Sequence, residues 1–252
     1  MALKVLILGG TSDGRVLAQR LAQDARFAPL LSFAGRTGSL ADPGVPHRIG
    51  GFGGVPGLAA ALERHDVLVD ATHPFAAQMS HHAARAAELA GLPLLRLEAP
   101  AWVSVPGDRW QHVEDMAAAA AALGAGSRRV FLSIGRLEVG AFRVVPQHAY
   151  LIRAVDAFDP ELPGARVIAA RGPFALESER ALLVQERIEV IVSKNSGTPA
   201  TYAKLEAARE LGLPVIMVER PRLPPAETCS SVEAALDWLR ARHDASTTKR
   251  GV

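Results

Sequence analysis

Three glycines near the N-terminus have the spacing of a phosphate-binding turn. Gly9 and Gly10 directly follow the apolar run at residues 5–8, and Gly14 stands four residues further on. Backbone N–H groups at such a turn, with the positive end of the following helix dipole, can hold the pyrophosphate of a nucleotide. The spacing is G-G-x-x-x-G rather than the standard G-x-G-x-x-G, so an ordinary strand-to-helix turn is the alternative interpretation.

The neighbours of these glycines complete the expected cofactor turn. Thr11 and Ser12 can cap the helix or donate to a phosphate. Asp13 is unfavourable beside a pyrophosphate, and we expect its carboxylate to point away or to be offset by Arg15. The cofactor-binding residues predicted in this turn are Gly9, Gly10, Thr11, Ser12, Asp13, Gly14 and Arg15.

Gly35, Arg36 and Thr37 follow the second predicted strand. NAD-binding proteins usually carry an acidic residue there, which binds the ribose 2′-hydroxyl. An arginine with a nearby hydroxyl suits a 2′-phosphate instead. The sequence therefore favours NADP(H) over NAD(H), and a solvated loop cation is the alternative interpretation of Arg36.

Two further turns are predicted on the cofactor side. Gly51 and Phe52 would lie beside the adenine or the pyrophosphate, unless they form only a flexible turn. Ala71, Thr72 and His73 end the fourth predicted strand, where many reductases contact the nicotinamide. His73 could donate to the cofactor or act as a proton donor to the substrate. A histidine at a helix entry before proline is the alternative.

Cationic and polar turns also follow strands of the second half. A set of arginines, one lysine and neighbouring small residues would suit a ligand with several carboxylates. Ordinary surface charge is the alternative for each of them. The predicted substrate-binding residues are Ser133, Gly135, Arg136, Arg153, Arg171, Gly172, Pro173, Phe174, Lys194, Ser196 and Gly197. His73 and Lys194 are the predicted catalytic residues.

Alternating strand and helix patterns must position these turns. Predicted strands cover residues 5–8, 29–34, 47–50, 67–71, 93–97, 130–134, 150–155, 167–170, 190–193 and 215–218, with helical patterns between most of them. This rhythm predicts an α/β fold of two doubly wound, Rossmann-like parallel-sheet domains with a cleft between them. We expect an NADP-binding domain at residues 1–98, a substrate-binding α/β domain at 99–243 and a disordered tail at 244–252.

Composition narrows the functional class. A net charge of +2 in 252 residues, with 5% aromatics, argues against nucleic acid as a partner. No apolar run approaches the roughly 20 residues of a membrane span, and no signal peptide is predicted. A single cysteine, Cys229, suits the cytoplasm. The adjacent His81 and His82 would face different ways on a helix, so no metal site is predicted. A monomer is the working expectation, although the sequence leaves the oligomeric state open.

With these motifs assembled, the chain resembles the precorrin-6A reductase family of corrin (cobalamin) biosynthesis over roughly residues 3–240. The resemblance rests on the blocks Gly9–Arg15, Asp70–Ala76, Gly172–Phe174 with Glu177, Lys194–Gly197 with Lys204, and Leu213–Ile216 leading to Arg220 and Pro221. It implies an NADPH-dependent oxidoreductase that acts on a CH–CH bond and converts precorrin-6A to precorrin-6B. The substrate would be a tetrapyrrole with acetate and propionate side chains. The proton donor, and whether the substrate is metal-free or cobalt-bound, stay open.

Two other functions remain open at this point. An NADP-dependent reductase of a small cyclic imine, similar to dihydrodipicolinate reductases, would have a comparable turn after the fourth strand but usually an open mixed sheet in its second domain. A non-catalytic NADP-sensing protein would not need the second set of cationic turns. A short-chain dehydrogenase is disfavoured, because neither Tyr150 nor Tyr202 has a lysine four residues later.

Overall fold

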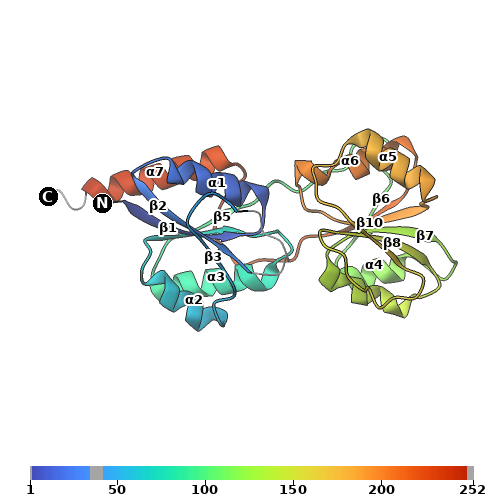
Figure 1. The fold of residues 1–252 in the computed structure, drawn as a ribbon, viewed down its shortest axis with the longest axis horizontal. Coiled ribbons are helices and arrows are strands. Elements are labelled where there is room, and N and C mark those ends of the chain that lie inside the picture. Colours follow the sequence, from blue (N-terminus) through green and yellow to red (C-terminus); the bar gives the residue numbers. More distant parts are fainter. Residues whose placement is uncertain (1, 35–41, 249–252) are drawn as a thin grey trace. The chain divides into compact units, whose positions relative to one another are not determined.

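The computed structural model describes residues 2–34 and 42–248 and divides the chain into two compact units (Figure 1). The first unit contains the chain up to Pro100 and again from Arg222 onward, and the second contains Ala101–Pro221. Each unit is built on one six-stranded, fully parallel sheet with helices on both faces. The predicted fold class of two doubly wound parallel-sheet domains is therefore confirmed, and the cleft between them stays a prediction.

The first sheet has the strand order β12-β5-β4-β1-β2-β3. Its strands are β1 Leu3–Gly9, β2 Phe27–Phe33, β3 His47–Ile49, β4 Val67–Ala71, β5 Leu94–Leu97 and β12 Glu227–Cys229. One face is covered by α1 Ser12–Ala22 and α7 Val232–Thr248, and the other by α2 Gly54–Leu62 and α3 Ala77–Ala90 (Figure 1).

The continuous apolar run of β1 is explained by these two covered faces. Val5 and Ile7 are buried in the cluster on the α1 and α7 side, whereas Leu6 and Leu8 are buried on the α2 and α3 side. Successive side chains of a strand point to opposite faces, so a strand covered on both faces needs apolar residues at every position.

The second sheet has the order β6-β11-β10-β7-β8-β9. Its strands are β6 Trp110–Val113, β7 Arg129–Ser133, β8 Ala149–Ala154, β9 Arg166–Ala169, β10 Val190–Lys194 and β11 Val215–Val218. Its helices are α4 Met116–Ala122, α5 Leu176–Gln185 and α6 Ala203–Glu210, with the 3₁₀ helices η1 Arg136–Val144 and η2 Pro199–Thr201.

The predicted domain boundaries are wrong in the C-terminal part. After the second unit the chain returns to the first, where β12 pairs with β5 and α7 packs on α1. Residues 222–243 therefore do not belong to the second domain. The edge strands β6 and β12 are short and partly polar, so they lack an apolar run like those of β1, β4 and β11.

The predicted disordered tail is also corrected, because α7 continues to Thr248. Its sequence contains no proline or glycine before that point, so nothing stops the helix at residue 243. Residues 249–252 lie outside the described part of the chain. No helix among residues 2–34 and 42–248 is long and apolar enough to cross a membrane.

Candidate active site

The glycine turn between β1 and α1 lies at the switch point of the first sheet, where the neighbours β2 and β4 lie on opposite sides of β1. A Cβ atom on Gly14 would lie 2.8 Å from the Cβ of Ala71 in β4, so glycine is what lets α1 pack on the sheet. The Thr11 side chain caps α1 by accepting from the Gly14 N–H at 3.2 Å, and its hydroxyl donates to the Ala71 carbonyl at 3.0 Å.

Gly10 brings this turn against the loop that follows β4. A Cβ atom on Gly10 would lie 3.0 Å from the His73 nitrogen and 3.1 Å from the Thr72 Cα. Two segments about 60 residues apart in the sequence thus form one edge of the first sheet, as the predicted cofactor site requires. Ligands of such sheets bind outside the carboxyl ends of the strands at this point.

The loop after β4 fixes the form of the His73 ring. The Phe75 N–H donates to His73 Nδ1 at 3.2 Å, and the Ala76 N–H donates to the His73 carbonyl at 2.7 Å. A ring nitrogen that accepts a hydrogen bond carries no proton, so the neutral ring has its proton on Nε2. His73 is half-buried and can present Nε2–H as a donor.

A buried carboxylate supports this loop from below. Asp70 is 1% exposed, and its Oδ1 accepts from the Thr72 hydroxyl at 2.7 Å and from the Thr72 N–H at 3.2 Å. The Arg96 Nε of the adjacent strand β5 lies 3.6 Å from Asp70 Oδ2, and Arg96 also donates to the Pro224 carbonyl. Sequence reasoning quoted Asp70 only as part of a motif and missed Arg96, because their pairing depends on strand neighbours that are not adjacent in sequence.

The structure describes part of the ribose side of the predicted cofactor site. Gly35, Arg36 and Thr37 lie outside the described residues. Arg48, which sequence reasoning missed, stacks over the Phe52 ring at 4.0 Å and donates to the Ser32 hydroxyl and to the Gly50 and Gly51 carbonyls. Arg48 therefore holds the predicted turn at Gly51 and Phe52 against the end of β2. The sequence could have indicated Arg48, because it lies near the end of a predicted strand and shortly before two glycines.

Ser12, Asp13 and Arg15 occupy the first turn of α1. The Ser12 hydroxyl faces Asp13 Oδ1 at 3.5 Å, and the Arg15 guanidinium lies 5.9 Å from the centre of the Phe33 ring. Asp13 is placed where the helix dipole favours a negative charge. Gly9 approaches β2, since its Cβ would lie 3.0 Å from a Leu31 methyl group.

The corresponding switch point of the second sheet lies between β7 and β10. Lys194, the last residue of β10, forms an ion pair of 2.5 Å with Glu138 in the first turn of η1. A Cβ atom on Gly135 would lie 2.5 Å from Glu138 Oε2 and 3.4 Å from Lys194 Nζ. The structure thus brings together the predicted residues Gly135 and Lys194, and it adds Glu138, which sequence reasoning missed.

Arg153, predicted to bind the substrate, is buried and paired in the second unit. Its side chain is 5% exposed and pairs with Glu179 of α5, 3% exposed, at 2.5 Å. The guanidinium also stacks on Phe131 and, at 3.8 Å from the ring centre, on Phe174. A cation in the middle of a sheet is tolerated because it is paired. Arg153 therefore supports the turn that contains Phe174.

Lys204 of α6 is a second buried cation near this turn. Its ammonium group donates to the Thr201 carbonyl at 2.7 Å and lies 4.7 Å from the centre of the Trp102 ring. Burial, reinforced by the charge of Arg153, lowers the pKa of Lys204 to about 7. Phe174 N–H donates to the Ala200 carbonyl, which joins the turn after β9 to the segment before α6.

The remaining predicted substrate-binding residues lie at the same carboxyl edge of the second sheet, and they differ in solvent exposure. Arg136 and Arg171 are exposed, and Ser133 and Gly172 are half-buried. Ser196 is buried, with its N–H donating to the Lys194 carbonyl at 2.8 Å, and Gly197 has a φ of +73°. Pro173, next to Phe174, is exposed.

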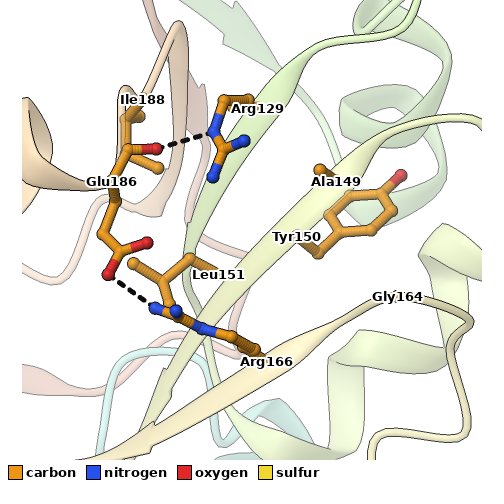
Figure 2. A pocket seen from close by; sticks show the side chains of 8 residues that line it. All are labelled: Arg129, Ala149, Tyr150, Leu151, Gly164, Arg166, Glu186 and Ile188. Atoms are coloured by element: carbon orange, nitrogen blue, oxygen red, sulfur yellow. Dashed lines mark hydrogen bonds and ion pairs between the residues drawn. The ribbon is translucent and has the colours of Figure 1, made fainter.

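A small hollow of about 70 Å³ lies at the opposite, amino edge of the second sheet (Figure 2). Figure 2 shows Arg129 and Arg166 on either side of Glu186, which accepts from Arg129 through its carbonyl and pairs with Arg166 through its carboxylate. Arg129 and Arg166 begin strands β7 and β9, so this hollow is separate from the turns at the carboxyl edge.

Comparison with known proteins assigns the chain. A family model described as "Precorrin-6x reductase CbiJ/CobK" matches residues 4–240. A precorrin-6A reductase of Sinorhizobium sp is 51% identical over 94% of both chains, and that of Rhodobacter capsulatus is 47% identical over 99% of both. A solved structure titled "CobK precorrin-6A reductase" matches with a TM-score of 0.90 and 46% identity, covering 96% of this chain and 97% of that one.

These similarities extend over both units and agree with the motifs at their switch points. The predicted resemblance is confirmed. The chain belongs to the precorrin-6x reductase family CbiJ/CobK, a family of oxidoreductases of cobalamin biosynthesis.

Proposed function

We propose that this protein reduces a ring double bond of precorrin-6A, giving precorrin-6B, with NADPH as the hydride donor. The observation that carries the proposal is the glycine turn of the first unit, which packs directly against the His73 loop at the switch point of the sheet. The protein would act in the cytoplasm on a tetrapyrrole with several carboxylates.

The residues of the first unit fit a dinucleotide. Glycines stand where a Cβ atom would collide with the neighbouring loop or strand, at Gly10 and Gly14. The first turn of α1 presents N–H groups that have no partner within the helix, and Thr11 satisfies the one at Gly14. When bound there, the cofactor supplies the hydride. Gly9–Arg15 would hold its pyrophosphate, and Thr72 and His73 would orient its nicotinamide end.

His73 would serve as a hydrogen-bond donor through Nε2. The bond from the Phe75 N–H to Nδ1 keeps the neutral ring in that form, and the Asp70–Thr72 bonds hold the loop. A donor at this place can orient a carboxamide or a substrate group. Proton delivery by His73 would need the imidazolium form, in which Nδ1 also carries a proton and no longer accepts from the Phe75 N–H. Asp70 takes no direct part, because it is buried beneath the loop.

Lys194 would bind a carboxylate of the substrate in the second unit. It lies at the carboxyl end of the central strand β10, beside Gly135, where a ligand of this fold is expected. Arg136 and Arg171 are exposed near the same edge and could meet further acetate or propionate groups. Arg153, held by Glu179, would keep Phe174 and its turn in place.

The preference for NADPH rests on Arg36 in the sequence. Replacing Arg36 with alanine should raise the KM for NADPH at least tenfold and leave the KM for NADH nearly unchanged, because only NADPH carries the 2′-phosphate. Arg85→Ala, which removes an exposed cation paired with Glu88 on α3, is the matched control. An equal effect of Arg36→Ala on both cofactors would contradict the 2′-phosphate assignment.

The activity itself is tested by NADPH absorbance at 340 nm under anaerobic conditions with precorrin-6A. NADPH oxidation together with a shift of the tetrapyrrole spectrum is the expected result, with NADH in a parallel reaction. Oxidation that requires no tetrapyrrole would contradict the proposal. A reaction only with the cobalt-bound substrate would correct the substrate while leaving the reductase assignment in place.

A further inference from the structure

The pair Lys194–Glu138 occupies the place where the substrate should meet the second unit. Lys194 Nζ and Glu138 Oε1 are 2.5 Å apart, and their side chains are 12% and 27% exposed. Gly135 lies directly against both groups, since its Cβ would contact each of them. A carboxylate of the protein itself therefore already sits on the lysine at the carboxyl edge of β7 and β10.

The element that carries Glu138 can release it without disturbing the core. Glu138 lies in the first turn of η1, a 3₁₀ helix of nine residues, and such helices are seldom longer than three or four. Val139 and Phe142 anchor η1 through buried side chains, 1% and 0% exposed. Glu138 itself is half-buried, so a change of its side-chain rotamer is enough to move the carboxylate toward solvent.

Another ion pair of the same unit is too buried to exchange with a ligand, and it serves as a comparison. Arg153 and Glu179 are 5% and 3% exposed, and the cation also stacks on two aromatic rings. Exchange of that pair with a ligand would first require the core to open. The Lys194–Glu138 pair is several times more exposed and lies at a strand end, so a ligand carboxylate can reach it.

We propose that Glu138 is a resident carboxylate that holds Lys194 until a carboxylate of the substrate replaces it. This inference rests on the proposed role of Lys194 in substrate binding. A largely buried ammonium group without a counter-charge is unfavourable, so the lysine needs a partner in the free protein. Two carboxylates on one ammonium group repel each other, so Glu138 leaves when the substrate arrives. Glu138 thus tunes affinity and selects ligands whose carboxylate can displace it.

The inference predicts the sign of an effect. Glu138→Gln removes the competing charge at nearly constant size, so precorrin-6A should bind on the order of tenfold more tightly, read as a lower Kd without cofactor and a lower KM in turnover. Glu138→Asp keeps the charge and should stay near the wild-type values. The Kd for NADPH, measured by fluorescence, should stay unchanged in both variants.

A double-variant cycle separates competition from a structural role. In Lys194→Met, substrate binding should weaken, and adding Glu138→Gln should then have no further effect, because the group that the two carboxylates share is gone. Urea unfolding of each variant, followed by tryptophan fluorescence, shows that it is folded. Unchanged or weaker binding by folded Glu138→Gln would overturn the inference, as would an equal gain in the Lys194→Met background.

The same cycle distinguishes this failure from failure of the proposed function. If Lys194→Met leaves precorrin-6A binding intact, the proposed role of Lys194 is wrong and the inference falls with it. If Lys194→Met weakens binding while Glu138→Gln does not strengthen it, only the exchange of carboxylates is wrong.

Discussion

The two units share the order of five strands, β5-β4-β1-β2-β3 and β11-β10-β7-β8-β9, but differ at their switch points. In the first, β1 leads through Gly9 and Gly10 into α1, and N–H groups at the helix start are the available donors. In the second, β7 leads through Gly135 into the 3₁₀ helix η1, and the charged groups are the side chains of Lys194 and Glu138. The proposed function thus places a backbone site for a phosphate and a side-chain site for a carboxylate on one topology.

The buried ion pairs beneath these edges differ in the same way. In the first unit, Asp70 accepts two hydrogen bonds from Thr72 and lies 3.6 Å from Arg96. In the second, Arg153 and Glu179 are in direct contact at 2.5 Å. The buried charge of Asp70 is therefore stabilised mainly by hydrogen bonds from its own loop. The buried charge of Glu179 is stabilised mainly by the Arg153 guanidinium.

The largest expected effect tests this difference between the ion pairs. Arg153→Met leaves the Glu179 carboxylate buried without its cation and should cost about 3–5 kcal/mol of unfolding free energy. Arg96→Met should cost less, about 1–3 kcal/mol, because Thr72 still donates twice to Asp70. Midpoints of urea unfolding measure both.

Two further variants control this comparison. The double change Arg153→Met with Glu179→Gln removes the bare charge and should recover part of the loss. Arg85→Met breaks an exposed pair on α3 and should cost at most about 0.5 kcal/mol. Equal losses of unfolding free energy for Arg153→Met and Arg96→Met would contradict this comparison. They would show that the distance between the paired groups does not decide how much stability the cation contributes.

A pH effect of intermediate size should come from the second unit. Burial lowers the pKa of Lys204 to about 7, whereas in the unfolded chain it returns to its ordinary range. Above pH 7 the unfolded state binds the additional proton, so unfolding free energy should rise with pH. The wild type should gain about 2–3 kcal/mol relative to Lys204→Met between pH 7 and pH 9.

The reference for this titration is Lys204→Met, which lacks the buried ammonium group. A wild-type curve parallel to that of Lys204→Met over this range would mean that Lys204 keeps its proton in the folded protein.

The smallest expected effect compares the two glycine turns. Gly14→Ala places a Cβ 2.8 Å from that of Ala71 in a rigid strand and should cost about 1–3 kcal/mol, although alanine normally favours a helix. NADPH binding should weaken with it. Gly135→Ala meets the flexible end of Glu138 instead, and should cost less than about 1 kcal/mol.

A rescue variant sharpens this test. Ala71→Gly removes the atom that Gly14→Ala would meet, so the double variant should recover NADPH binding and most of the stability lost. No recovery would show that another contact of the added methyl group, such as the one with the Ala71 carbonyl oxygen at 3.4 Å, causes the loss.

Much of the fold followed from local patterns. The apolar runs at residues 67–71 and 215–218 are β4 and β11, because strands buried on both faces must be apolar throughout. The edge strands β6 and β12 escaped prediction since three or four half-exposed residues leave no such run. At the site, Gly14 and Lys194 could be chosen from their places after strands, whereas the ion pair that buries Arg153 could not be predicted.

The sequence by itself determined the parallel α/β class, the turns that follow each strand and the family, because these depend on local apolar runs, glycine spacing and motifs. Only the tertiary structure decided which charges pair. Asp70 with Arg96, Arg153 with Glu179 and Glu138 with Lys194 are 26, 26 and 56 residues apart. It also decided that the chain returns after Pro221 to complete the first sheet. These pairings and this return of the chain depend on which strands become neighbours, and no local sequence pattern predicts that.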